Sequence, residues 1–346
     1  MAVPAAGTFT ASQLLRIQAM ASDLWADNQT RADYIAEADV LNAIRSEQTA
    51  RLSALQDPEK TRTVRLMWLD ACEVAVDDVD DDCDLTGTEA SSDSKDYTLD
   101  LFKRTVISVK EIENRTDEFN TQQKAARLML AADKALTEWL ATQLMAKIET
   151  FRGTNTYTTP VGSTAWTFAA SDTTIPADQW NTELFPKLSL CARKNKILNP
   201  FLVSGEALWY TNENAYNNVG NDDGKGDNVR NQKYFSRRYF DPVRIDEANS
   251  GTLKAYMISR GALAVVTKTH YPTAPVVYHN PWHSRYRMPS QNMPGIDYEV
   301  TYTQSCVSNE ITHTWQLKLN AGIFINPTGC TESRTGILSF VRETGL

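Results

Sequence analysis

The stretch that decides the fold is residues 121–152, TQQKAARLMLAADKALTEWLATQLMAKIETFR. Apolar residues recur in it at steps of three or four, which is the spacing of one face of an α-helix. Asn120 precedes the stretch as a candidate N-cap, with Gln123 three residues further on. At 1.5 Å per residue such a helix is roughly 48 Å long. One apolar stripe on so long a helix predicts a spine packed along a sheet.

The segments before this helix have a different period. Residues 61–76 and 97–112 alternate with a two-residue beat, and the polar segment 77–96 between them contains a run of aspartates. This pattern predicts one long β-hairpin with strands of roughly 50 Å. A hairpin that long exposes more surface than its own subunit can bury, so we expect it to lie on another surface. Its apolar side comprises Val64, Leu66, Trp68, Leu99 and Leu101.

The two ends of the chain carry weaker patterns. Residues 1–57 contain two modest helical stripes, the first including Trp25, which must lie either on the chain's own body or on a neighbouring chain. Near the other end, residues 297–304 and 310–319 alternate and predict an antiparallel pair, followed by a separate short strand at 323–325.

Composition restricts the classes of function. The chain has 346 residues, 42% of them hydrophobic, and a net charge of −8. No apolar run is long enough for a membrane span, and the first ten residues do not resemble a secretory signal. The negative charge argues against a protein that binds nucleic acid mainly by neutralising phosphates. The five cysteines have no zinc-ligand spacing and are read as reduced thiols.

No motif for catalysis or cofactor binding is found. The sequence lacks a phosphate-binding G-x-x-x-x-G-K-[ST] loop and a G-x-S-x-G nucleophile motif. His279 and His283 are interpreted as loop residues, because Pro281 between them breaks any helix that would align them. We therefore predict no catalytic residue, no cofactor and no metal centre.

The aspartate run is the sharpest local signal. Its carboxylates fall at positions 1, 3, 5, 7 and 12 of a calcium-binding loop, but Cys83 stands where that loop needs glycine. Calcium binding is thus a weak hypothesis, beside a solvated acidic loop and an electrostatic contact with a partner. Arg237, Arg238 and Lys233 form a basic patch suited to such a contact. The weak calcium candidates are Asp78, Asp80, Asp82, Asp84 and Glu89.

Taken together, the order of elements resembles a tailed-phage major capsid protein of the Hong Kong 97 type. The phrases at residues 201–209 and 255–265 look like axial-domain strands of that family. The resemblance implies an α+β fold with five parts. These are an N-terminal helical arm at 1–60, an extended β-hairpin loop at 61–117, a peripheral domain with the spine helix at 118–177, an axial α/β domain at 178–295, and terminal strands at 296–346 that return to the peripheral and axial sheets.

The resemblance also implies a function. Copies of the chain would assemble through pentamers and hexamers into the icosahedral shell enclosing double-stranded DNA, touching the DNA only by weak non-specific contact. The shell would belong to the virion and assemble in the host bacterial cytoplasm, with possible scaffold, portal and decoration partners and no membrane. The candidates for subunit contacts are Trp25, Val64, Leu66, Trp68, Asp80, Asp82, Leu99, Leu101, Arg237 and Arg238.

Three alternatives stay open at the level of sequence. An encapsulin-like nanocompartment would share the fold and differ in holding a protein cargo. Another phage structural protein could bind calcium through its acidic loop. A soluble enzyme of unknown chemistry is the third.

Overall fold

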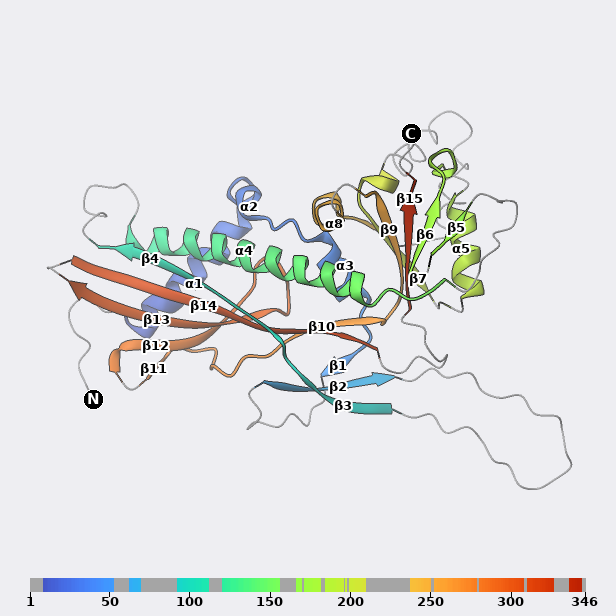
Figure 1. Cartoon of the computed structure of the whole chain (residues 1–346). Coiled ribbons are helices and arrows are strands. Elements are labelled where there is room, and N and C mark those ends of the chain that lie inside the picture. The colour runs from blue at the N-terminus through green and yellow to red at the C-terminus, as the bar shows by residue number, and fades with distance from the viewer. Residues whose placement is uncertain are drawn as a thin grey trace, which may run out of the picture.

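The computed structural model contains helices, two large sheets and one small sheet (Figure 1). The mixed helix and sheet content confirms the predicted α+β class. The structure describes residues 9–52, 62–69, 92–111, 120–155, 166–169, 171–181, 184–195, 197, 199–209, 237–249, 252–278, 280–307, 310–326 and 336–343.

The long sheet is organised around one strand, β14. Ala321 of β14 pairs with both Thr267 of β10 and Leu101 of β4, so β10 and β4 lie on opposite edges of β14. Strand β13 also pairs with β14, and β12 and β11 follow outward from it. The strands are β4 (Leu101–Lys110), β10 (Leu263–Thr267), β11 (Val276–Tyr278), β12 (Asn280–Pro289), β13 (Asp297–Val307) and β14 (Glu310–Ile325).

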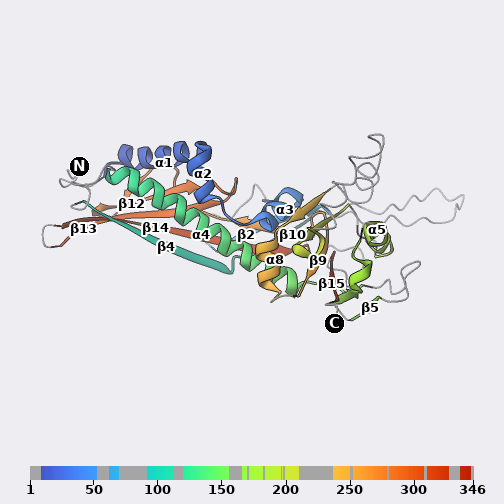
Figure 2. The same cartoon turned by 90° about the horizontal axis from the view of Figure 1, so that it is seen from above.

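The predicted spine helix is confirmed as α4 (Thr121–Thr150). Asn120 caps it in the predicted way: its side chain accepts a hydrogen bond from the backbone N–H of Gln123, whose side chain accepts one from the backbone N–H of Asn120. Figures 1 and 2 show α4 lying along β4, β13 and β14, and its buried side chains form the main core with them.

The N-terminal helices pack on the chain's own body. They are α1 (Ala11–Ala26), α2 (Asn28–Tyr34) and α3 (Asp39–Glu47). Leu14, Ile17 and Ala21 of α1 are buried in the core that α4 forms with the long sheet. The sequence left open whether the arm lies on its own body or on a neighbouring chain. The described part of the arm lies on its own body.

The hairpin prediction needs a correction. Strands β2 (Thr63–Leu69) and β3 (Ser92–Thr98) pair as expected, with β1 (Arg51–Leu52) on the outer edge of β2. Residues 97–112, however, do not continue as one hairpin strand. After β3 the chain changes partner, and β4 pairs with β14 over ten positions. Pairing with β14 gives the backbone N–H and C=O groups of β4 hydrogen-bond partners in a large sheet. In a two-stranded ribbon about half of these groups would have no strand partner.

A second large sheet forms a separate layer. Its order is β5-β6-β15-β9-β7-β8, and helix α5 packs against it through a second hydrophobic cluster. The elements are β5 (Thr167–Phe168), β6 (Asp172–Ile175), the short helix η2 (Ala177–Gln179), α5 (Leu184–Lys194), β7 (Pro200–Ser204), β8 (Arg238–Phe240), α8 (Pro242–Ala248), β9 (Lys254–Ser259) and β15 (Ile337–Arg342).

Two smaller predictions from the C-terminal half are also corrected. The predicted pair at 297–304 and 310–319 exists, but residues 323–325 continue β14 rather than forming a separate strand. His283 lies in β12 rather than in a loop, because Pro281 stands near the beginning of that strand, where a missing N–H is tolerated. His279 lies outside the described residues.

Strand β10 connects two cores. Its Leu263 and Val265 face the main core under α4, whereas Ala264 and Val266 face a third cluster beneath the hairpin base. A strand with both faces buried between a helix layer and a small sheet holds three layers together. The hairpin base is therefore fixed to the same rigid body as the spine.

The turn that leads into β10 requires glycine. Gly261 has φ +76°, its N–H donates to the carbonyl of Glu47 at 3.0 Å, and a Cβ there would lie 2.2 Å from Thr49 Oγ1. We expect Gly261→Ala to lower the free energy of unfolding by about 2 kcal/mol, from the left-handed backbone and the steric clash together. In Gly261→Ala/Thr49→Ala the clash is removed, so about half of the loss should return. Denaturant titration of both variants measures this, and equal stability of wild type and single variant would contradict it.

Candidate assembly surfaces

The hairpin base is anchored by its own hydrophobic cluster. Val64, Leu66 and Trp68 of β2 are each 1% exposed and pack with Leu99 against Ala264 and Val266 of β10. These apolar residues are buried inside their own subunit, where they anchor the hairpin base, and their contact with a neighbouring subunit stays a prediction. The same holds for Leu101, which is buried in the main core.

The residues on either side of positions 70–91 meet at this anchored base. Leu69 and Ser92 are register partners at the open end of the β2–β3 pair. The two residues that flank positions 70–91 are therefore held at one fixed point of the body. The calcium and contact candidates of the aspartate run, Asp78, Asp80, Asp82, Asp84 and Glu89, all lie outside the described residues. Lys233 of the predicted basic patch also lies outside them.

The arginines of the basic patch predicted as a partner for that run are engaged within the chain. Arg237 and Tyr239 both donate to the buried carboxylate of Glu47, the tyrosine at 3.0 Å. The guanidinium of Arg238 lies 4.1 Å from the centroid of the Phe185 ring. Arg237 stabilises the contact between α3 and the second sheet and keeps only part of its surface accessible, whereas Arg238 packs on α5.

The remaining contact candidate, Trp25, is half-buried. It packs against the main core, and the guanidinium of Arg31 lies 5.6 Å from the centroid of its ring.

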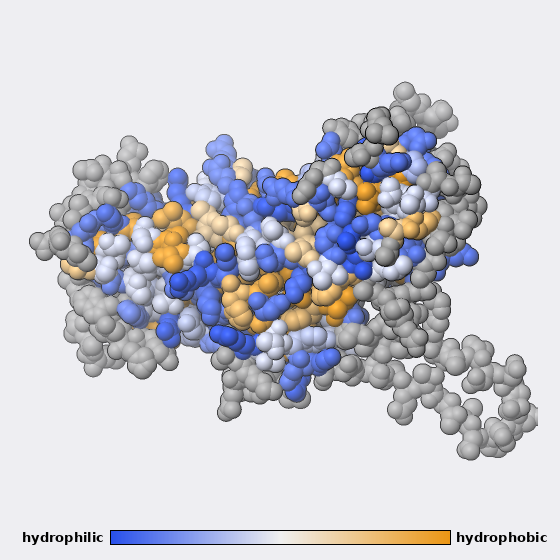
Figure 3. All heavy atoms as spheres, viewed as in Figure 1, coloured by the Kyte–Doolittle hydropathy of each residue, from blue (hydrophilic) through white to orange (hydrophobic). Residues whose placement is uncertain are grey.

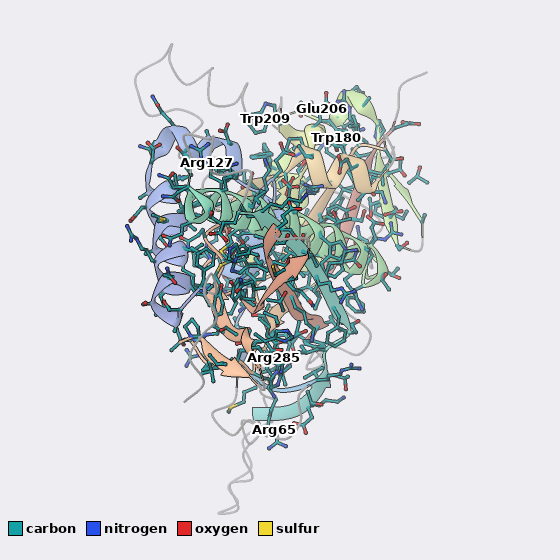
Figure 4. All side chains as sticks on the ribbon, turned by 90° about the vertical axis from the view of Figure 1, so that its left-hand side faces the viewer. Arg65, Arg127, Trp180, Glu206, Trp209 and Arg285 are labelled. Carbon is teal, nitrogen blue, oxygen red and sulfur yellow. The ribbon has the colours of Figure 1, made fainter. Side chains whose placement is uncertain are left out.

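Nearby, a groove of about 250 Å³ separates the C-terminal half of α1 from the first turns of α4. Figure 4 shows Arg127 of α4 beside α1, far from Arg65 on β2. The groove is lined by Met20, Asp23, Leu24, Asp27, Gln123 and Arg127.

The face of the long sheet that points away from α4 presents one continuous row of partners. Val106, Gln316, Thr301, Arg285 and Val276 pair in that order across β4, β14, β13, β12 and β11. The row begins and ends with valines that are 54% and 47% exposed. We call this surface, with the side chains of the same parity on these strands, the outer sheet face.

The outer sheet face carries more cations than carboxylates. Lys110 pairs with Glu310 at 3.0 Å, and Lys318 lies 3.6 Å from Glu299. The first pair is exposed and adds little stability, so it can exchange partners, whereas Glu299 of the second pair is buried and hydrogen-bonded to His270. The cations are Arg104, Lys110, Arg285, Arg287 and Lys318, and the carboxylates are Asp297, Glu299 and Glu310.

Sequence reasoning missed this face because its side chains are ordinary polar residues. The signal was the alternation of residues 310–319, whose polar positions all fall on one side of β14. These polar side chains join those of β4, β13 and β12 in one surface only through the register of the sheet. No local sequence pattern gives that register. Figure 3 shows hydrophobic patches separated by hydrophilic residues on the side viewed in Figure 1.

A charged cluster joins the end of the spine to the second sheet. Glu149 accepts hydrogen bonds from the Tyr256 hydroxyl and from Lys254 Nζ, the latter at 3.2 Å. Its carboxylate also lies 3.2 Å from Arg152 Nη1. Arg152 also donates to Asp172 of β6 at 2.5 Å. Burial, followed by the contact with Glu149, raises the pKa of the Tyr256 hydroxyl, which keeps it protonated as a donor.

This cluster gives a prediction for the junction. Tyr256→Phe removes one donor to Glu149, and because Lys254 and Arg152 remain, we expect a loss of about 1–2 kcal/mol. Hydrogen exchange of residues 254–259 should show faster opening of β9 in this variant. The half-exposed Tyr271→Phe is the matched control, with no more than about 0.5 kcal/mol expected. Unchanged protection in Tyr256→Phe would show that the cluster does not hold the junction.

The described residues contain no group of three or more His, Cys, Asp or Glu placed to hold a metal ion. Within the same part of the chain, no helix is both long and apolar enough to cross a membrane. Cys191 is buried and Cys306 is exposed, and neither forms a disulfide.

Comparison with solved structures finds chains with a similar course. A chain of the Cyanophage A-1(L) capsid asymmetric unit is 10% identical at a TM-score of 0.47, over 88% of this chain and 93% of that one. A chain of the Cyanophage P-SCSP1u capsid is 8% identical at a TM-score of 0.46, over 88% and 89%. Both cyanophage structures are capsids. A chain of Mycobacterium phage Che8 is 12% identical at a TM-score of 0.36, over 84% and 92%.

No protein-family model matches the chain, and no curated protein sequence does. The outer sheet face, the anchored hairpin base and the spine junction rest on contacts within this chain alone.

Proposed function

We propose that the chain is the major capsid protein of a tailed bacteriophage, which self-assembles into the icosahedral shell enclosing double-stranded DNA. The observation that carries this proposal is the anchored hairpin base. Its dedicated hydrophobic cluster fixes Leu69 and Ser92 to the rigid body formed by α4 and the long sheet. Such an anchor serves a segment whose partner is outside its own subunit.

The proposed contact joins two copies in a head-to-tail manner. Residues 77–84 of one copy, with six aspartates, would lie on the outer sheet face of the next copy, whose cations exceed its carboxylates. Complementary charge of this kind selects partner and register more than it adds affinity. A heterologous contact closes into rings when its rotation permits, which is how pentamers and hexamers form.

The other parts of the proposal follow from the role as a shell protein. The role is structural rather than enzymatic, and the chain would be located in the virion after assembly in the host cytoplasm. Contact with DNA would be weak and non-specific because the chain is acidic overall. Scaffold, portal and decoration proteins are further proposed partners, and the division at residues 60, 117, 177 and 295 stays a prediction.

Size analysis of the purified chain tests the proposal. We expect sedimentation velocity to show rings of five and six copies, or closed particles, in place of monomers. Particles recovered from cells that contain nuclease-protected DNA support a phage capsid, whereas a single co-purifying protein inside them would favour the nanocompartment alternative. A chain that stays monomeric when concentrated and salted would contradict assembly altogether.

A further inference from the structure

The N-terminal end of the described chain is held by an aromatic cluster on the long sheet. The Phe9 ring stacks on the imidazole of His313, with centroids 4.3 Å apart and planes at 23°. The backbone N–H of Phe9 donates to the hydroxyl of Tyr302 at 3.2 Å. Trp315 completes the cluster, 5.9 Å from Phe9 between centroids. This contact fixes the residue that precedes the N-cap of α1, and with it the start of the N-terminal helices.

The histidine in this cluster is enclosed. His313 is 1% exposed, and its Nδ1 lies 2.9 Å from the Tyr302 hydroxyl. The buried hydrogen of that hydroxyl needs an acceptor, and Nδ1 provides one in the tautomer whose ring hydrogen is on Nε2, so we assign that tautomer. The ring hydrogen then lies on Nε2, on the side of Glu111, whose Oε2 is 4.0 Å away and beyond hydrogen-bond distance.

A proton added to His313 conflicts with this pattern. The proton goes from solvent to Nδ1, which changes from an acceptor into a donor. The Tyr302 oxygen then faces two donors, the Phe9 N–H and the Nδ1–H, and the tyrosine hydrogen loses its acceptor. An unpaired buried hydroxyl hydrogen and a buried imidazolium both disfavour the docked state.

The ionisable groups facing His313 are few. Tyr302 of β13 and Glu111 at the end of β4 are those that contact it among the described residues. Glu111 and the Phe9 ring both favour the charged imidazolium. Burial outweighs them, however, and holds the pKa of His313 below the ordinary value of 6.5. The Phe9 ring covers one face of the imidazole, so moving this ring away uncovers that face.

We propose that Phe9, Tyr302 and His313 form an acid-sensitive latch, in which protonation of His313 releases the N-terminal segment from the long sheet. The sign follows from linkage. The released state binds the proton more readily, so docking is complete above about pH 6.5 and weakens as the pH falls below that value. Between the released and docked pKa values of His313, the ratio of released to docked chain rises up to about tenfold per pH unit.

Hydrogen exchange of the full-length chain, normalised for intrinsic rates, tests the latch. Peptides that begin at Phe9 and cover the first turns of α1 should be protected at about pH 7.5 and lose protection towards about pH 5. His313→Phe keeps the stacked ring without a titrating group and should stay protected at both values. His283→Gln removes an exposed histidine of β12 and should behave as wild type.

A second variant keeps the test decisive if His313→Phe does not fold. Glu111 favours the protonated form of His313 while the latch is docked, so Glu111→Gln should lower the docked pKa further and move the midpoint of release to higher pH. Equal protection of the wild type at both pH values would overturn the proposal. The proposal would also be overturned if His313→Phe lost protection at about pH 5 as the wild type does. An unchanged midpoint of release in Glu111→Gln would overturn it as well.

Discussion

Replacing residues 70–91 with a two-residue Asn-Gly turn is expected to give a folded chain that does not assemble. Leu69 and Ser92 face each other in the β2–β3 ladder, so a tight turn can join them without changing register. The cluster under the hairpin base stays intact, because Val64, Leu66 and Trp68 all precede the deletion. Sedimentation velocity should show monomers, with an unchanged near-ultraviolet circular dichroism spectrum.

A full-length variant separates the effect of the segment's length from the effect of its negative charge. Changing the six aspartates between residues 77 and 84 to asparagine keeps the segment's length and removes its charge. If attraction to the outer sheet face guides assembly, this variant should assemble more slowly and with weaker dependence on salt than the wild type. Normal shells from the Asn-Gly variant would show that residues 70–91 make no essential contact.

The second large effect is expected at Asp133, in the middle of the spine. Its carboxylate is fully buried and accepts hydrogen bonds from the Tyr298 hydroxyl at 2.7 Å, the Ser290 hydroxyl at 2.5 Å and two backbone N–H groups of the loop after β12. Asn292 of that loop also accepts from the N–H of Ala36 at 2.7 Å. The carboxylate thus joins the spine, the loop after β12 and the N-terminal segment.

Asp133→Ala should lower the free energy of unfolding by about 3–5 kcal/mol, because several buried donors lose their acceptor together. Burial raises the pKa of Tyr298 well above its usual range, so its hydroxyl keeps its proton and must exchange the carboxylate for the weaker acceptor Thr137 Oγ1, 3.2 Å away. Denaturant titration of the unassembled chain measures the loss. The control is Asp100→Asn, which removes an exposed partner of Lys147 and should change stability by no more than about 0.5 kcal/mol. A loss below about 1 kcal/mol in Asp133→Ala would contradict the role given to this carboxylate.

The spine and the last two long strands were predictable because their signals are local. Capping by Asn120 and Gln123 and the periodic apolar side chains of α4 depend only on residues within a few turns. The same holds for the alternation in β14. The partner of each strand is not local, and that is where the hairpin prediction was wrong. Leu99 and Leu101 look alike in sequence, yet one packs under the hairpin base and the other in the main core.

The partner of a candidate contact residue is not a local property either. Val64, Leu66 and Trp68 form an apolar stripe, and an apolar stripe needs cover, but sequence does not say whether the cover comes from the same chain. Arg237 likewise looked available because its partner, Glu47, lies far away in sequence. Asp80, Asp82 and the other residues of the aspartate run stay untested predictions.

A reconstruction of assembled particles by electron cryo-microscopy tests the central claim most directly. We predict closed shells of five- and six-membered rings, with density for residues 70–91 of each copy on a neighbouring copy and the aspartates near Arg104 and Arg285 of that copy's outer sheet face. Density for residues 70–91 folded back on its own chain, or particles without five- and six-membered rings, would contradict the account.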